Sequence, residues 1–142
     1  HATVMRRVAE NCLVNPSLLF QFGIRSASAV EYRWGKENTS FFPHELAEPL
    51  RDVIAALGRR PVYLSLDIDI VDPGEAPGTG TPEPCGFSAR EVLHALTLMK
   101  DLHMIGFDIV EVSPPNDING ITSALAAGLV RECLIMWGRD DS

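Results

Sequence analysis

The chain has 142 residues, of which 46% are hydrophobic, and a formal net charge of −7 at pH 7. This length suits one domain at most, with enough apolar residues for a real core. The negative charge argues against nucleic acid or an anionic membrane as partner, and it fits a cation as ligand, either a metal ion or a positively charged substrate. The longest apolar runs fall short of a bilayer span and no signal peptide is visible, so we expect a cytoplasmic protein.

Apolar spacing and helix breakers divide the first 57 residues into four segments. We expect a helix over residues 2–13, a strand over 18–24, a polar loop over 25–42 and a helix over 43–57. The last segment has apolar side chains at helical spacing, and Gly58 supplies its C-terminal stop.

A short apolar run, residues 62–66, predicts a buried strand that is central in a parallel sheet. Asp67, Asp69 and Asp72 follow it closely. In an extended chain Asp67 and Asp69 would project from the same face, about 6.6 Å apart. Two such carboxylates repel each other and are costly to desolvate, and a hard divalent cation would make them tolerable. Asp72 precedes a Pro-Gly pair, so a turn-forming role is an equal alternative for it.

The rest of the chain alternates between loops, helices and one more strand. Ser88 and Glu91 form a capping-box pattern at the start of a helix. We expect the following elements: a loop over 72–86, a helix from 88 to about 100, a strand over 102–112, a loop over 113–120 and a helix over 121–136. This alternation predicts an α/β fold whose parallel sheet is covered on both sides. Ligands bind at the carboxyl ends of the strands in such sheets.

Two acids lie near the end of the second predicted strand. Glu111 is a candidate functional residue, and its alternative is an ion pair with a basic neighbour. Asp108 precedes it by three residues and therefore faces the other side of the strand, so we expect a structural role. The glycines of residues 76–84 would let backbone approach a ligand closely. This loop lacks the lysine and the following helix of a phosphate-binding loop.

Three collinear segments resemble the second half of the ureohydrolases, the arginase and agmatinase family. They are residues 65–73 (SLDIDIVDP), 76–82 (APGTGTP) and 108–114 (DIVEVSP). The Glu-Pro pair at 83–84 and the start of the chain, His1-Ala-Thr, resemble the agmatinase and guanidinobutyrase branch.

The resemblance implies a three-layer α/β/α arginase-like fold with a parallel sheet, of which residues 1–142 would be the carboxyl-terminal portion of a single domain. It also implies Mn²⁺-dependent hydrolysis of an agmatine-like guanidino compound to urea and an amine. A complete site would hold two Mn²⁺ ions. By motif position, Asp67 and Asp69 would be metal ligands.

The remaining roles also follow from motif position in the resemblance. Glu111 would hold the guanidinium group by charge-assisted hydrogen bonds, and His1 would be the proton shuttle. Thr79 and Thr81 would line the substrate pocket. The implied partner is a small guanidino substrate, and the complete protein would be a homo-oligomer, a trimer or hexamer.

The sequence departs from the family pattern in one respect. The family draws its other metal ligands from a Gly-Gly-Asp-His segment and an Asp-Ala-His-x-Asp segment upstream of the His1 position, and neither occurs here. We therefore expect little activity from this chain unless another chain supplies the first half. One alternative is a non-catalytic family member or a structural or regulatory subunit. Another is a Mg²⁺-dependent phosphatase of the haloacid-dehalogenase type, because Asp67-x-Asp69 also fits its motif.

Overall fold

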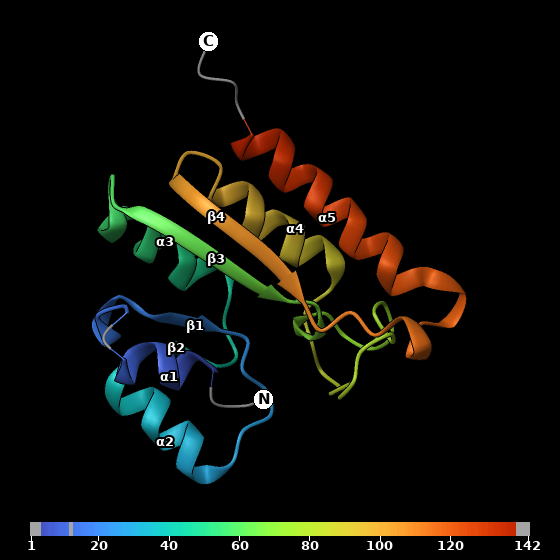
Figure 1. Ribbon diagram of the computed structural model, residues 1–142, viewed down its shortest axis with the longest axis horizontal. Helices are drawn as coiled ribbons and strands as arrows, with labels where there is room; N and C mark the ends of the chain where they lie inside the picture. The colour runs from blue at the N-terminus through green and yellow to red at the C-terminus, as the bar shows by residue number, and fades with distance from the viewer. Residues whose placement is uncertain (1–3, 12, 139–142) are drawn as a thin grey trace. The chain divides into compact units, whose positions relative to one another are not determined.

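A computed structural model describes residues 4–11 and 13–138. The chain forms two compact units, His1–Glu45 and Leu46–Ser142 (Figure 1). Within the part that the structure describes, each unit contains one pair of parallel strands. These parallel pairs confirm the strand direction that the sequence predicts.

In the residues that the structure describes, the first unit has two α-helices and two short strands. In chain order these are α1 (Val4–Glu10), β1 (Phe20–Phe22), α2 (Ala29–Asn38) and β2 (Ser40–Phe42), with a single 3₁₀ turn at Pro16–Leu18. Phe22 lies opposite Phe42 in the register of β1 and β2, and their rings stack with centroids 5.0 Å apart. Aromatic side chains thus stabilise this small sheet.

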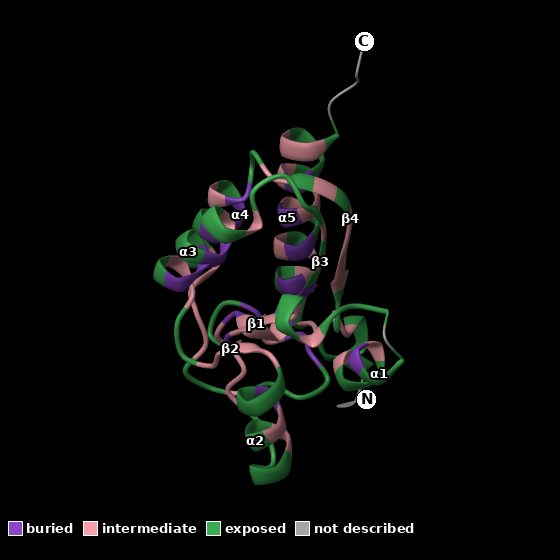
Figure 2. Cartoon of the chain, turned by 90° about the vertical axis from the view of Figure 1, so that its left-hand side faces the viewer, coloured by how far each residue is buried: buried purple, intermediate pink, exposed green. Residues whose placement is uncertain are grey.

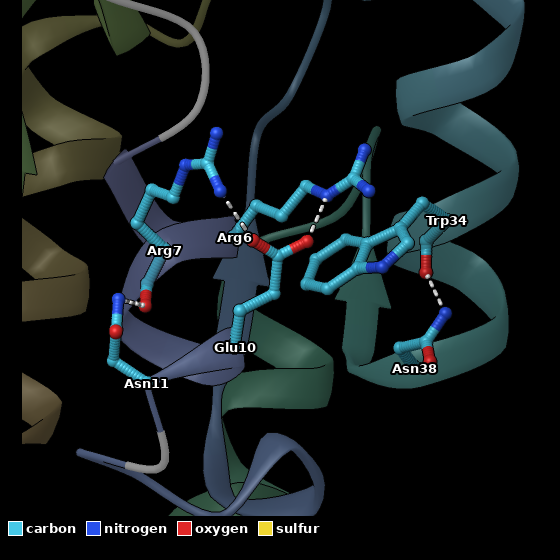
Figure 3. A network of polar contacts seen from close by, with 6 residues as sticks. All are labelled: Arg6, Arg7, Glu10, Asn11, Trp34 and Asn38. Atoms are coloured by element: carbon cyan, nitrogen blue, oxygen red, sulfur yellow. Dashed lines mark hydrogen bonds and ion pairs between the residues drawn. The ribbon is translucent and has the colours of Figure 1, made fainter.

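Figure 3 shows the polar contacts of α1 and α2. Arg6 Nε and Arg7 Nη1 donate to the two carboxylate oxygens of Glu10, at 2.7 and 2.9 Å. The Arg6 guanidinium carbon lies 5.8 Å from the centre of the Trp34 ring, which is a cation–π distance. The two ion pairs are exposed and each contributes little to stability. The Arg6–Trp34 contact joins the two helices of this unit.

The predicted loop over residues 25–42 is wrong, because this segment contains α2 and β2. Ser28 and Glu31 form a capping box at the start of α2: the Glu31 N–H donates to Ser28 Oγ, and the Ser28 N–H donates to Glu31 Oε2. The helix is polar on most of its surface, so it shows little apolar periodicity. The Ser-x-x-Glu spacing was the available signal.

The second unit contains three helices and a pair of long strands. Its elements are α3 (Ala47–Leu57), β3 (Pro61–Asp67), α4 (Ala89–Leu98), β4 (His103–Val110) and α5 (Ile121–Trp137). These agree with the predicted elements apart from their exact ends. The strands β3 and β4 are parallel, and Asp67 lies opposite Val110. In Figures 1 and 2 the three helices lie on the same side of this strand pair.

The core of the second unit lies between the strand pair and these helices. It consists of buried side chains from β3 and from all three helices, including Val53, Leu66, Val92, Leu96, Leu129 and Cys133; buried positions are drawn in purple in Figure 2. Trp137, at the end of α5, packs edge-on against Phe107 of β4 and donates its indole N–H to the carbonyl oxygen of Met99 at 3.3 Å. This contact fixes α5 on the sheet.

The opposite face of β3 and β4 is not the fully buried surface that the apolar run predicts. Tyr63 is 60% exposed and Ile105 is 63% exposed. On this face Tyr63 Oη and Ser65 Oγ each donate a 2.7 Å hydrogen bond to the carboxylate of Asp108. The two bonds give Asp108 the structural role that its position in the strand predicts. In the second unit, the described residues cover one face of the strand pair.

The expectation that no segment could span a membrane needs correction. Residues 118–137 are long and apolar enough by length and mean hydropathy alone. One stripe of α5 is buried, namely Thr122, Ala126, Leu129 and Cys133. Arg131 and Glu132 interrupt the apolar surface. A helix that packs one stripe into a protein core passes the same test as a membrane span.

Candidate functional site

The carboxyl end of β3 brings together most of the predicted site residues of the second unit. Asp67 is the last residue of β3 and lies opposite Val110 in β4, so Glu111 follows immediately after its partner. The parallel arrangement therefore places the ends of both strands, with their acidic residues, at the same edge.

Asp67 and Asp69 are close together but do not project from one face of an extended strand. The strand ends at Asp67, and Ile68–Ile70 form a 3₁₀ turn. The Asp69 N–H donates to Asp67 Oδ1 at 3.1 Å, which is the local bond that short acidic side chains offer at the end of a strand. Ile68 is fully buried and anchors the turn. The predicted spacing of an extended chain is wrong for this reason.

The pKa of Asp67 rises to about 6, mainly because of burial, and the negative charges of Asp69 and Glu111 contribute to the rise. The hydrogen bond from the Asp69 N–H favours the charged form but does not outweigh burial. Both neighbouring carboxylates thus disfavour the charged form of Asp67. Ionisation of Asp67 in these surroundings is energetically unfavourable, and a nearby cation would reduce that cost.

Glu111 has an unusual backbone conformation. Its φ is +65°, in the left-handed region that side-chain-bearing residues seldom occupy. Holding a glutamate there costs about 1 kcal/mol. The side chain is exposed. Strained backbone of this kind is common at binding sites, where the surrounding structure holds a side chain in a required direction.

The two predicted pocket threonines differ in their surroundings. Thr79 forms an isolated β-bridge with Val112, so it lies beside the residue that follows Glu111. It is only 3% exposed, and its Oγ1 has no hydrogen-bond partner among the described residues. Thr81 is exposed and lies two residues further along the loop. Thr79 is therefore next to the acidic edge, whereas Thr81 is exposed to solvent.

Asp72 has a different role from this group, and the structure does not describe His1. The carboxylate of Asp72 accepts hydrogen bonds from the Gly74 N–H at 2.9 Å and the Gly86 N–H at 3.1 Å. These bonds favour the turn-forming alternative for Asp72 over a metal-binding one. His1 lies outside the described residues. Its predicted role as proton shuttle stays a prediction.

One acid that the sequence analysis passed over has a defined role. Asp117 accepts hydrogen bonds from the backbone N–H groups of Thr122 and Ser123, at 2.9 and 2.8 Å, and from Ser123 Oγ at 2.6 Å. The Ser123 hydroxyl is the main reason why the pKa of Asp117 falls to about 2. Its position shortly before a helix with a Thr-Ser pair in the first turn was the available signal.

The two aspartates at this edge are suitable ligands for a divalent cation, but they form only part of a metal site. Asp67 and Asp69 offer carboxylate oxygens, which are hard ligands suited to Mg²⁺ or Mn²⁺. No group of three His, Cys, Asp or Glu side chains in residues 4–11 and 13–138 could hold a metal ion. The two aspartates could therefore contribute part of a coordination shell.

The sequence matches the arginase family over residues 1–136. The agmatinase of Bacillus cereus is 38% identical over 140 residues, which cover 96% of this chain and 48% of the relative. The guanidinobutyrase of Pseudomonas aeruginosa is 38% identical over 143 residues, with coverage of 94% and 45%. The solved structure of proclavaminate amidinohydrolase from Streptomyces clavuligerus has a TM-score of 0.82 at 37% identity, and the match covers 94% of this chain and 46% of that one.

The structural likeness confirms the predicted arginase-like α/β fold. The chain spans about half the length of the curated relatives it matches.

Proposed function

The chain belongs to the arginase family, and we propose that it forms part of a ureohydrolase that hydrolyses a guanidino compound to urea and an amine. The proposed substrate is agmatine-like. Support comes from the names of the relatives, an agmatinase and a guanidinobutyrase. A cationic guanidinium also suits a site edge where carboxylates accumulate.

The observation that carries this proposal is the convergence of three carboxylates at the ends of β3 and β4. Asp67 lies opposite Val110, the residue before Glu111, and the Asp69 N–H donates to Asp67 Oδ1. The raised pKa of Asp67 agrees with this arrangement. Carboxylates whose pKa is raised by burial and by neighbouring negative charges cluster at functional sites.

We propose that Asp67 and Asp69 bind Mn²⁺ and that a complete site holds two such ions. Bound divalent ions lower the pKa of water and so supply hydroxide at neutral pH. By the complete protein we mean residues 1–142 together with the chain or subunit that completes the domain. The metal ligands other than Asp67 and Asp69 would come from that second part. A protonated Asp67 cannot act as a metal ligand, so binding of the metal ion would require Asp67 to lose its proton.

Glu111 would bind the substrate. Its carboxylate can accept two N–H bonds from a planar guanidinium group, and such charge-assisted pairs fix orientation as well as affinity. The strained backbone at Glu111 would hold the carboxylate in place before the substrate arrives. His1 would transfer protons to the leaving amine, in line with its motif position.

The test is urea release by the complete protein with Mn²⁺ and a panel of guanidino compounds. We expect Asp67→Asn to abolish hydrolysis, because the substitution removes a charged ligand while it retains the shape. Asp108→Asn is the matched control, since Asp108 lies in the paired strand and its carboxylate accepts hydrogen bonds from Tyr63 and Ser65 on the exposed face of the strand pair. It should retain activity. Wild-type rates in Asp67→Asn would exclude the proposed metal site.

A structural or regulatory subunit is the second candidate, because the described residues hold too few ligands for a metal centre of their own. Absence of urea release, together with stable association with an intact family member, would favour it. The phosphatase alternative is contradicted by the match to the arginase family over residues 1–136.

A further inference from the structure

The loop that contains Thr79 is bonded to the start of α5. The Gly78 N–H donates a 2.7 Å hydrogen bond to Thr122 Oγ1, and Thr122 is fully buried. The two residues are 44 positions apart in the chain. A buried bond of this kind is costly to break because the Gly78 N–H would lose this buried acceptor.

Gly78 also packs tightly against Asp117. A Cβ atom added at Gly78 would lie 2.6 Å from Asp117 Cβ and 2.8 Å from Asp117 Cα, which is closer than real atoms approach. Only glycine therefore fits at this position. Asp117 is itself held by its three hydrogen bonds to the first turn of α5. The first turn of α5 thus fixes both the bond and the packing contact.

The same loop is bonded to the segment that follows Glu111. The Ser113 N–H donates to the carbonyl oxygen of Gly78 at 2.8 Å. Asn116 Nδ2 donates to the carbonyl oxygen of Thr79 at 3.3 Å. Together with the bridge between Thr79 and Val112, these bonds attach the Thr79 loop to the residues just beyond the substrate-binding carboxylate.

We propose that Asp117 and Thr122 are positioning residues, which hold the Thr79 loop against the segment after Glu111 and so set the shape of the guanidinium site. This inference rests on the proposed function. Neither residue would touch the substrate. Their effect is transmitted through Gly78, whose amide and Cα are both in contact with them.

The test compares two neighbouring residues of α5 in the complete protein. Thr122→Val retains the side-chain shape but removes the acceptor for the Gly78 N–H. We expect kcat/KM to fall about 10- to 100-fold, mainly through a higher KM, because small displacements near a reacting group have effects of this size. Bound Mn²⁺ should be unchanged, since Asp67 and Asp69 are not in this network. Thr122→Ser, which restores the hydroxyl, should recover most of the activity.

Ser123→Ala is the matched control. It removes a hydrogen bond to Asp117 from the same helical turn but leaves the Gly78–Thr122 bond intact. A merely structural role would lower the Tm of both variants and leave KM unchanged in both. In Ser123→Ala, Asp117 keeps its two bonds from backbone N–H groups and the Gly78 N–H keeps its acceptor. Our inference therefore predicts a raised KM in Thr122→Val and not in Ser123→Ala, and a wild-type KM in Thr122→Val would overturn it.

Two further measurements cover the remaining outcomes. If Thr122→Val does not fold, Gly78→Ala replaces it, because the added Cβ must displace the loop from Asp117; an unchanged KM would then overturn the inference. If the wild-type protein releases no urea from any guanidino compound, the proposed function fails, and amide NMR decides the positioning separately. Thr122→Val should then shift the Thr79 and Ser113 amide resonances while Ser123→Ala does not, and unshifted resonances would overturn the inference.

Discussion

Asp67 is the last residue of β3 and Asp117 lies in the loop after the neighbouring strand β4, yet their surroundings shift their pKa values in opposite directions. Burial and two negative neighbours raise the pKa of Asp67 to about 6. Hydrogen bonds from Ser123 and Thr122 lower the pKa of Asp117 to about 2. Burial of Asp67 and the hydrogen-bond donors around Asp117 account for the difference. A carboxylate with three donors stabilises the fold, whereas one with a single donor and two anionic neighbours is suited to a cation.

The largest expected effect concerns metal binding at Asp67. Mn²⁺ at about 100 times its Kd should stabilise the complete protein by about 2.7 kcal/mol, because the ion binds only the folded state. Thermal melts with and without Mn²⁺ measure this shift. Asp67→Asn should abolish the shift, and Asp117→Asn should leave it in place. Equal Tm shifts with Mn²⁺ in wild type and Asp67→Asn would show that Asp67 is not a metal ligand.

The second effect concerns Asp117. Asp117→Ala should lower the Tm by several degrees at pH 7, because the first turn of α5 loses its acceptors. The folded pKa is lowered below the unfolded value, so the stabilisation is present above about pH 4 and is lost as the pH falls toward 2. Wild type and variant should therefore converge in acid. Melts from pH 2 to 7 would show this, and a constant difference would contradict it.

A smaller effect of opposite sign is expected at Asp67 without metal. Asp67→Asn should stabilise the metal-free protein at pH 7 by about 0.5–1 kcal/mol, because it removes a half-buried charge from two anionic neighbours, with the gain reduced by solvent screening. Urea denaturation in the presence of a chelator measures the change. A marked loss of stability would mean that the Asp67 carboxylate also has a structural role.

The smallest effect is expected at the exposed face of the same strand pair. Tyr63→Phe removes one of the two hydroxyl donors to Asp108, and we expect a change within about 0.5 kcal/mol because the bond is exposed to water. Denaturation curves of wild type and variant provide the measurement. A larger loss would place Asp108 with Asp117 among the acids on which the fold depends.

The sequence predicted most of this acidic edge. The apolar run before Asp67 and the strand before Glu111 gave the elements, and the rule that ligands bind at the carboxyl ends of parallel strands gave their meeting point. The local geometry was less accessible. Whether the strand continues through Asp69 depends on a single side-chain to backbone bond, which competes with extended structure by a small free energy.

The contacts around Gly78 could not be predicted from the sequence. A Gly-rich loop gives no sign of which distant residue fills the space next to it, and the packing against Asp117 depends on the placement of α5. Likewise, β2 is too short to be distinguished from a loop without its partner β1. Tertiary contacts decided both cases, whereas periodicity describes only neighbours along the chain.

The parallel pairing of β3 and β4 also has a consequence for folding kinetics. Residues 68–102 separate the two strands, so a hairpin cannot nucleate their pairing. Before the strands pair, the chain must lose the conformational entropy of closing this long connection. Contacts so distant in sequence form late and slowly. Asp67 and Glu111 approach each other only when this pairing is complete. A partly folded chain would therefore lack the proposed cation site, and binding of the metal ion would be coupled to the final folding step.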